Sequence, residues 1–501
     1  MHQSDPNRLR RLIRGAPLSG LAAAVLALLS ACAQGPEYQR PEVTVPAAWR
    51  APQIDAADVV NTAWWETFGD ADLNRLIQDV LDANQDLQIA TLRIEEFDAR
   101  LQISRAALTP QLGASGEVKR VRYSEQRAVP LPLGTDVISN SYEGSFNLSW
   151  ELDIWGRVQR SNEAARAELM SREEVRRGVM LTVATAAASS YMQLLGLDDQ
   201  LAIMRLNLKN RQEALALIDT KYQGGSASKL DVARARVAAE EIETILPELE
   251  RQVAVLEGGV SALLARPPGP VPRGKWQALK LPDVPQGVPS DLLARRPDVL
   301  AAEQDLVAAN ARIGVAKAQY FPRLSLTAML GLSSKEANQW AQRPSMFGDI
   351  GPSMLATIFD GGRIAGDVRQ TEAMQKQAVL RYRQTVTVAM KEVEDALISR
   401  SKATEQTALL GRQLVSRREV SELTRMRFDG GRSDLKDVLD AELQQLTTEQ
   451  QQSNSRRDQV VALIAVYKAM GGGWMADQDQ RRAMAAASMA AASAPKQETS
   501  E

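Results

Sequence analysis

The feature that most constrains the fold is an internal repeat. The segment 221–232, KYQGGSASKLDV, returns as 427–438, RFDGGRSDLKDV, 206 residues later. The tetrapeptide IWGR returns as DGGR at the same offset, and AALTP returns as AQYFP after 212 residues. Three matches in one order indicate a duplication. Each half therefore reads as a helix, a proline, strands, a long helix, a Gly-Gly turn and a second long helix.

The helices are expected to be unusually long. No proline occurs from Gly156 to Tyr222, and 67 helical residues would extend roughly 100 Å. Apolar residues follow a spacing of three and four along this stretch, with Arg211 in one of the apolar places. The stretch after the turn continues nearly the same pattern. A period near 3.5 predicts helices packed as coiled coils.

Short alternating stretches interrupt the helices. Apolar and polar residues alternate strictly at 142–152 and at 324–332, with less regular partners at 111–121 and 350–360, so four strands are expected. About ten residues is the length of a tilted strand that crosses a bilayer, although an amphipathic sheet on a soluble core has the same period. Four strands cannot close a barrel, and lipid does not tolerate open edges. If these strands lie in a membrane, several chains must share one barrel.

The start of the chain resembles an export signal. Four arginines precede the apolar run 16–31, which ends at Cys32, the only cysteine of the sequence. A basic start, a short apolar core and a small-residue exit are typical of a cleaved signal. The triplet before Cys32 resembles the bacterial lipobox, which implies cleavage there and lipid attachment to Cys32. The alternative is an ordinary signal peptide beside an inert thiol. No apolar run of eighteen residues follows, so strands are expected to make any membrane crossing.

Composition argues against catalysis and nucleic-acid binding. Without residues 1–31 the chain carries 60 − 4 = 56 basic and 62 − 1 = 61 acidic groups, a net charge of −5, and no basic patch of the kind that holds nucleic acid. The only histidine, His2, leaves with the signal. No imidazole base, free thiolate or zinc motif would remain. We expect neither an enzyme nor a metal protein, and no cofactor besides the lipid on Cys32.

Several motifs together resemble a known family, the outer-membrane efflux channels similar to TolC, in their lipoprotein (NodT-type) branch. They are CAQGPEYQRP at 32–41, WWETF at 64–68, LLARRPD at 292–298 and FDGGR at 359–363, with the two Gly-Gly turns. The resemblance runs from Cys32 to about Trp474.

The resemblance implies a mostly α-helical chain with a small transmembrane β part. Three copies would form a twelve-stranded outer-membrane barrel, with four strands from each chain, continued by a periplasmic coiled-coil α-barrel. It implies an outer-membrane exit channel of a tripartite efflux system, passively conducting drugs and toxic compounds. The partners would be a periplasmic adaptor and an inner-membrane pump, usually proton-driven and of the RND type. A protein-secretion duct and a lipid-anchored coiled-coil scaffold stay open as alternatives.

The resemblance also implies site residues. Asp437 and Asp440 lie three apart at a helix start, hence on one face, and would form acidic rings at the periplasmic mouth that favour cations. Acidic residues at a helix N-terminus are also stabilised by the helix dipole alone. Asp231 is the counterpart in the first half and is expected to brace the closed mouth. Related channels often have an arginine where Ser433 stands, after Arg432, so this bracing network is in question.

The glycine pairs are expected to let the long helices reverse through positive φ and to form tips that contact the adaptor. They are Gly224, Gly225, Gly430 and Gly431.

Two tryptophan pairs are also expected to be structural. Trp64 and Trp65 are interpreted as packing the N-terminal segment on the helices, rather than stacking on a ligand. Trp150 and Trp155, at the end of the second strand, suit an interfacial belt.

The sequence divides into six predicted parts. They are a signal peptide at 1–31, a lipidated segment at 32–83 that packs on the tunnel, the first repeat at 84–265, a proline-rich connector at 266–290, the second repeat at 291–474, and a low-complexity tail at 475–501, expected to be disordered.

Overall fold

The computed structural model describes residues 34–44, 46, 49, 63–126, 128–129, 132, 136–282 and 295–472. Cys32 and the tail from 475 lie outside these residues. The described residues form two compact units. The first comprises those within Met1–Pro41, Ile94–Ser171 and Ala302–Tyr382, and the second those within Glu42–Arg93, Arg172–Ala301 and Arg383–Glu501.

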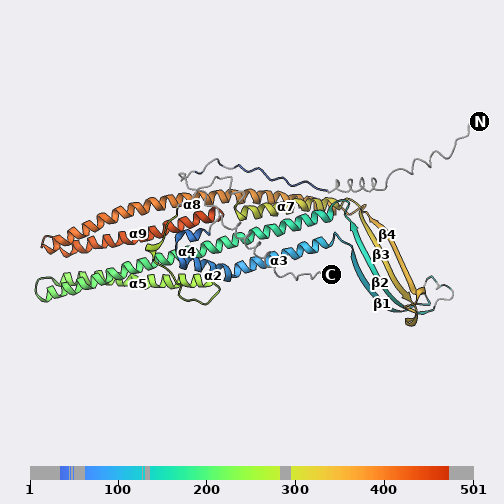
Figure 1. The fold of residues 1–501 in the computed structure, drawn as a ribbon, viewed down its shortest axis with the longest axis horizontal. Helices are drawn as coiled ribbons and strands as arrows, with labels where there is room; N and C mark the ends of the chain where they lie inside the picture. The colour runs from blue at the N-terminus through green and yellow to red at the C-terminus, as the bar shows by residue number, and fades with distance from the viewer. Residues whose placement is uncertain are drawn as a thin grey trace, which may run out of the picture. The chain divides into compact units, whose positions relative to one another are not determined.

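The two halves of the chain contain the same elements with matched helix lengths (Figure 1). The pairs have 22, 67 and 35 residues in each half. They are α3 (Gln85–Ala106) and α7 (Pro297–Ala318), α4 (Arg157–Gln223) and α8 (Arg363–Asp429), and α5 (Lys229–Leu263) and α9 (Leu435–Ala469). The predicted repeat is therefore present in the structure.

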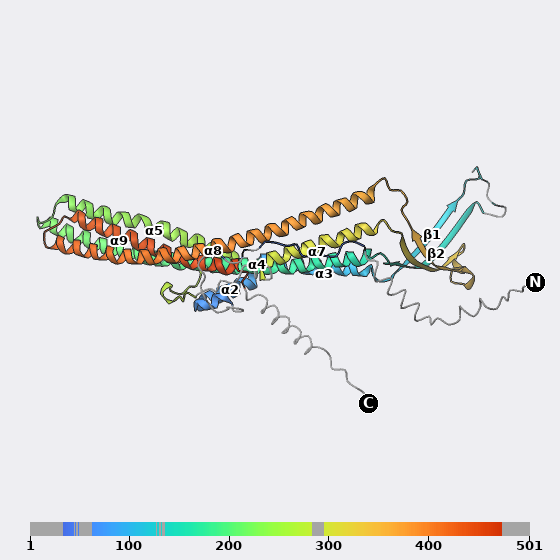
Figure 2. The same cartoon turned by 90° about the horizontal axis from the view of Figure 1, so that it is seen from above.

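Two strands stand between the first and second helix of each half, and all four form one antiparallel sheet (Figures 1 and 2). Its order is β1-β2-β3-β4. The strands are β1 (Gln111–Arg122), β2 (Ile138–Leu152), β3 (Arg323–Ser334) and β4 (Met346–Leu355). Within the described chain, β1 pairs only with β2 and β4 only with β3. Both outer strands therefore present an open edge.

The fourth strand differs from its predicted position of 350–360. It runs from Met346 to Leu355, and residues 356–360 are not in a strand. Leu355 lies opposite Arg323, the first residue of β3, so the neighbouring strand determines where β4 ends. Its early residues include glycine and aspartate, which weaken the strand pattern in the sequence.

One face of the sheet is apolar and exposed. Phe146 lies opposite Leu330, and Val118 lies opposite Tyr142, on this face. The exposed fractions of Phe146 and Val118 are 60% and 77%. The other face carries polar residues such as Ser145, which is buried. The pattern is that of a sheet with one face for lipid and one for water.

Hydrogen-bonded caps define where the long helices begin after the strands. Asp360, in the FDGGR motif, accepts hydrogen bonds from the backbone N–H groups of Ile364 (2.8 Å) and Gly362 (2.9 Å). These bonds hold the pKa of Asp360 below its usual value. In the first half, Asp153 accepts from the N–H of Gln159 (2.7 Å). Both carboxylates satisfy N–H groups that a helix start leaves free.

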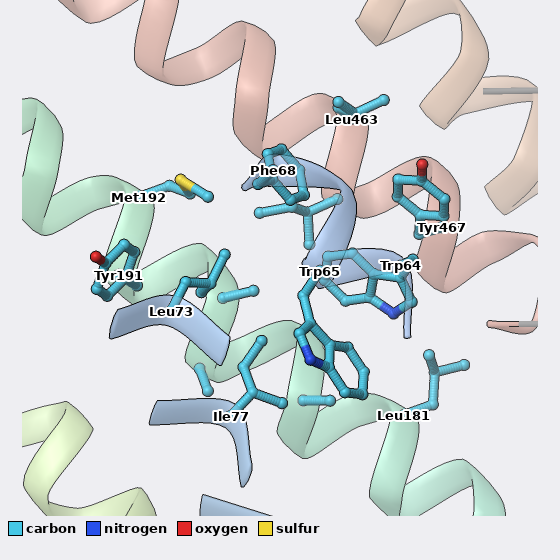
Figure 3. Close-up of a cluster of buried hydrophobic side chains, with 14 of the residues drawn as sticks. Trp64, Trp65, Phe68, Leu73, Ile77, Leu181, Tyr191, Met192, Leu463 and Tyr467 are labelled. Carbon is cyan, nitrogen blue, oxygen red and sulfur yellow. The ribbon is translucent and has the colours of Figure 1, made fainter. Parts of the chain in front are cut away.

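The N-terminal part of the second unit packs as predicted for Trp64 and Trp65. The 3-10 helix η1 (Trp64–Phe68) and helix α2 (Ala71–Ala83) place both indoles in a buried apolar cluster with α4 and α9 (Figure 3). Trp64 stacks on Tyr467 with ring centroids 5.1 Å apart and meets Trp65 edge-on at 5.6 Å. Short 3-10 turns, η2 (Trp276–Ala278), η4 (Ala337–Gln339) and η5 (Arg343–Ser345), lie in the connections.

Helix α4 contains an apolar window that was not expected from the sequence. Among the described helices it is the one with an 18-residue window apolar enough to cross a membrane by length and composition, with a mean hydropathy of 1.3. However, 61% of that window is buried inside the protein. Its alanines and leucines, including Ala184, Ala188 and Leu194, belong to the cluster around Trp64. Its apolar character therefore fits a core helix.

The helices of the two hairpins meet through apolar seams. Leu197, Leu201 and Met204 of α4 pack on Ile242 of α5 and Leu446 of α9.

Arg211 occupies one apolar place of the α4 seam, and only 7% of this residue is exposed. Its guanidinium group lies 3.2 Å from the carboxylate of Glu442 on α9, and burial lowers its pKa. Arg425 of α8 pairs with the same glutamate. One carboxylate thus joins three helices.

Candidate functional site

The two Gly-Gly turns of the second unit end α4 and α8 with the same hydrogen bonds. Gly225 (φ +76°) and Gly431 (φ +67°) adopt positive φ. The N–H of Ser226 donates to the carbonyl of Lys221, and that of Arg432 to the carbonyl of Arg427, both at 2.8 Å. This six-to-one bond is the Schellman ending of a helix.

The expected positive φ occurs at the second glycine of each pair and not at the first. Gly224 and Gly430 still donate to the helical carbonyls of Thr220 and Met426, both at 3.1 Å. They continue the helix, so only the second glycine of each pair needs a left-handed backbone.

A capping box starts the helix after each turn. At α5, the N–H and hydroxyl of Ser228 donate to the carboxylate of Asp231 (3.0 and 2.7 Å), and the N–H of Asp231 donates back to the Ser228 hydroxyl (3.1 Å). These bonds lower the pKa of Asp231. At α9, Asp434 and Asp437 form the equivalent box, with 3.4 Å from the Asp434 N–H to the Asp437 carboxylate. Asp231 and Asp437 thus occupy equivalent places and both stabilise a helix N-terminus.

Contacts between the two tips come from other residues than those predicted. An apolar cluster joins Ile218 and Val232 of the first hairpin to Leu435 of the second. The Lys221 ammonium lies over the Phe428 ring, 5.6 Å from its centroid, a cation–π distance. Ser433 donates within its own hairpin, to the carbonyl of Thr424 at 3.4 Å.

The bracing role expected of Asp231 therefore stays a prediction. Within this single chain, packing and one cation–π contact join the tips.

Asp440 lies one helical turn beyond Asp437 and is exposed. It lines a groove of about 550 Å³ between α5 and α9. Arg234, the residue at the repeat-equivalent place in the first half, lines the same groove. Of the two predicted gate residues, Asp440 is the one whose carboxylate lies outside the capping box.

The tryptophans at the ends of the strands have defined partners in the first unit. The Trp155 indole stacks on Phe321, with ring centroids 4.6 Å apart and planes at 23°, and donates to the carbonyl of Pro322 at 2.8 Å. The Trp150 indole donates to the carbonyl of Leu108 at 3.0 Å. Both indoles hold the segments where helices join the sheet.

Among the residues that the structure describes, no three His, Cys, Asp or Glu side chains lie close enough together to bind a metal ion. Arg211 is visible in the sequence as a charge in an apolar register, but its ion pair with Glu442 was not predicted. Arg296 lies within the LLARRPD motif, but no local pattern predicts its bonds to Glu392 and Ala469.

Comparison with known proteins gives matches over most of the chain. The family described as "Outer membrane efflux protein" matches residues 76–266 and 288–472. The chain is 32% identical to outer membrane protein OprJ of Pseudomonas aeruginosa over 445 residues, covering 86% of this chain and 91% of OprJ. It is 32% identical to nodulation protein T of Rhizobium leguminosarum over 439 residues, covering 85% and 87%.

Solved structures are similar over a comparable length. The structure of CusC superposes with a TM-score of 0.80 at 29% identity, covering 88% of this chain and all of CusC. In sequence, the chain is 30% identical to the cation efflux system protein CusC of Escherichia coli, covering 86% of this chain and 94% of CusC. The outer-membrane channel OprN superposes with a TM-score of 0.81 at 27% identity, covering 88% of this chain and all of OprN.

Proposed function

This chain belongs to the outer membrane efflux protein family, and we propose that it is the passive exit duct for small molecules expelled by a pump in the inner membrane. The family assignment confirms the resemblance, the fold class and the outer-membrane location predicted from the sequence. It also confirms the general function, an outer-membrane efflux channel. The family comprises channel proteins rather than enzymes.

The observation that carries the proposal is the sheet with two open edges and an exposed apolar face. Edge N–H and C=O groups left unpaired in lipid cost several kcal/mol each. The β1 edge of one copy would therefore pair with the β4 edge of the next. Three copies with four strands each would close a twelve-stranded barrel around a lumen lined by the polar face.

We assign the partners from the same family. The hairpin tips at Gly224–Gly225 and Gly430–Gly431 would contact a periplasmic adaptor. The adaptor would join the channel to an inner-membrane pump, a proton-driven transporter of the RND type. CusC is named for cation efflux, but the cargo here would be small molecules selected by the pump. A passive channel of this kind would require neither an energy source nor a catalytic site.

The gate would lie at the N-terminus of α9. Asp437 and Asp440 from three copies would form two acidic rings that favour cations and slow anions. Asp437 has a second task, because its carboxylate also caps α9. We therefore assign most of the ion selectivity to Asp440 and expect replacement of Asp437 to affect helix stability as well.

Conductance of the purified protein in planar bilayers tests the gate. Asp440→Ala should change single-channel conductance and abolish block by divalent cations, because the ring of charge that attracts and binds cations is lost. Asp429→Ala, which removes an exposed carboxylate at the end of α8, is the matched control and should behave as the parent. Unchanged conductance and block in Asp440→Ala would refute the gate, and a protein that does not conduct at all would refute the channel.

Lipid attachment and the division of the chain remain proposals of the same kind. We propose that the signal at 1–31 is removed and that Cys32 carries the lipid. We also propose that the rest of the chain divides into the segment 32–83, the repeats 84–265 and 291–474, the connector 266–290 and the tail 475–501. Mass spectrometry of the mature N-terminal peptide would test the first point directly, and an unmodified Cys32 thiol would contradict it.

A further inference from the structure

The segment Gln34–Arg40, here termed the N-terminal strap, lies on α4 and α7 in the first unit. The N–H of Gln34 donates to the carbonyl of Trp155 at 3.1 Å. The Arg160 guanidinium donates to the carbonyl of Gln34 at 3.3 Å, and the Asn310 amide donates to the carbonyl of Pro36 at 2.8 Å. One helix from each half of the chain, α4 and α7, thus binds the backbone of the strap.

Two buried polar side chains hold the strap. Arg160 and Asn310 are each only 5% exposed. A buried polar group is costly unless it is hydrogen-bonded. Besides the strap carbonyl, Arg160 bonds to Glu37 of the strap (2.5 Å) and to Glu163 of its own helix (2.7 Å). Removal of the strap would therefore leave both side chains with unmet hydrogen-bonding capacity.

Two glycines bring the backbones into direct contact. Gly35 has a φ of +101°, and a Cβ built on it would lie 2.6 Å from the Cα of Gly314. A Cβ built on Gly314 would lie 2.5 Å from the carbonyl oxygen of Gln34. Neither position accepts a side chain without displacing the strap. The surface of α7 is therefore shaped for this segment.

The second half of the strap is held by one carboxylate. The Tyr38 hydroxyl donates to Glu303 at 3.0 Å, and the Arg40 guanidinium donates to the same carboxylate at 2.5 Å. Burial and the neighbouring Glu303 charge raise the pKa of Tyr38. The strap is consequently fixed along its length, from Gln34 to Arg40.

We infer that Arg160, Asn310 and Gly314 form a seat that sets the level at which the lipid anchor enters the membrane. This inference rests on the proposed acylation of Cys32. Cys32 precedes Gln34 by two residues, so their Cα atoms are at most about 7 Å apart. Gln34 is bonded to Trp155, whose indole stacks on Phe321 between the end of β2 and the start of β3. Aromatic residues at strand ends suit the membrane interface. The seat thereby places the acyl chains at the inner rim of the barrel.

Proteolysis of the full-length protein tests whether the seat holds the strap. Cleavage by a glutamate-specific protease after Glu37 should be slow in the parent channel. Gly314→Ala and Asn310→Leu should each increase its rate at least ten-fold, because they block or abolish a contact with the strap. Gly366→Ala is the matched control, since a Cβ at this helical glycine of α8 meets open space. Equal rates in all four proteins would overturn the inference.

The depth of the strap relative to the membrane is a second measurement, and it would not change if the seat had only a structural role. With Cys32 acylated, Gln34→Cys creates the only free thiol, and a spin label there reports its depth in vesicles through collisions with oxygen and a nickel chelate. The label should be immobile at the interface in the parent, and mobile at another depth after Asn310→Leu. An unchanged depth and mobility would overturn the inference.

The N-terminal peptide mass separates the two proposals. An unmodified Cys32 would defeat the acylation on which the inference rests. An acylated Cys32 whose strap is equally protected and equally deep in every variant would defeat the seat alone.

Discussion

Arg296 lies in the second unit beside three helices, and its guanidinium group bonds to each of them. It donates to Asp298 at the start of α7 (3.0 and 2.7 Å), to Glu392 of α8 (2.7 Å) and to the carbonyl of Ala469 at the end of α9 (3.0 Å). Only 6% of Arg296 is exposed. The planar fork of arginine serves several acceptors at once, and lysine cannot reproduce this geometry. The second arginine of the LLARRPD motif is thus explained as a clamp.

Replacement of Arg296 should therefore destabilise the helical part. We expect Arg296→Ala to lose roughly 2 kcal/mol of stability, as is typical when hydrogen bonds to charged groups are removed, and Arg296→Lys to lose part of it. The measurement is the melting temperature in detergent. Lys391→Ala, which breaks an exposed ion pair with Asp395 on α8, should leave that temperature nearly unchanged. A similar melting temperature for Arg296→Ala and the parent would contradict the clamp.

At the scale of elements, the two hairpin tips share the same local structure. Each tip combines a Schellman ending, a left-handed glycine and a capping box within twelve residues, at repeat-equivalent positions. Backbone geometry thus accounts for Gly225, Gly431, Asp231 and Asp437 before any partner is considered. A contact with the adaptor must then depend on the exposed side chains beside the turns.

Cysteine crosslinking tests that contact. We expect Ser226→Cys and Arg432→Cys, both at exposed tip positions, to form adducts with cysteines placed on the adaptor of the same system. Asn338→Cys, exposed in the connection between β3 and β4, should form none, because it would lie on the outer side of the membrane. Absence of adducts from both tip variants, or equal yield from Asn338→Cys, would argue against docking.

At the scale of the whole molecule, the sheet is the part that a single copy leaves incomplete. Its edges, β1 and β4, come from opposite halves of the chain. Closure would therefore join the first half of one copy to the second half of its neighbour. Assembly and membrane insertion would thereby be coupled, because an unclosed sheet would expose edge groups to lipid.

Native mass spectrometry in detergent should accordingly find three copies. Val118→Arg, on the apolar face of β1, should reduce the recovered trimer, because arginine at the lipid face costs about 2–4 kcal/mol near the bilayer centre. Ser115→Arg, on the polar face of the same strand, should assemble normally. A monomeric parent protein, or equal losses in the two variants, would contradict the shared barrel.

Much of the architecture was predictable because its signals are local and periodic. Alternation revealed β2 and β3, and the repeated turn sequence revealed both hairpins. The start of β4 was not predictable from its glycine-containing residues, since its register comes from β3. Contacts such as Arg296 with Glu392 or Asn310 with Pro36 join residues 96 and 274 positions apart. They leave no local pattern, so only the folded chain reveals the clamp and the strap.

The equal lengths of corresponding helices carry an evolutionary consequence. A deletion of one heptad from α4 and α5 alone would shorten the first hairpin by about 10 Å, and Lys221 and Ile218 would lose their places beside Phe428 and Leu435. Natural variants that differ in reach should therefore gain or lose whole turns in both hairpins together. A protein in which only one hairpin became longer would need new contacts between the two hairpin tips in place of these.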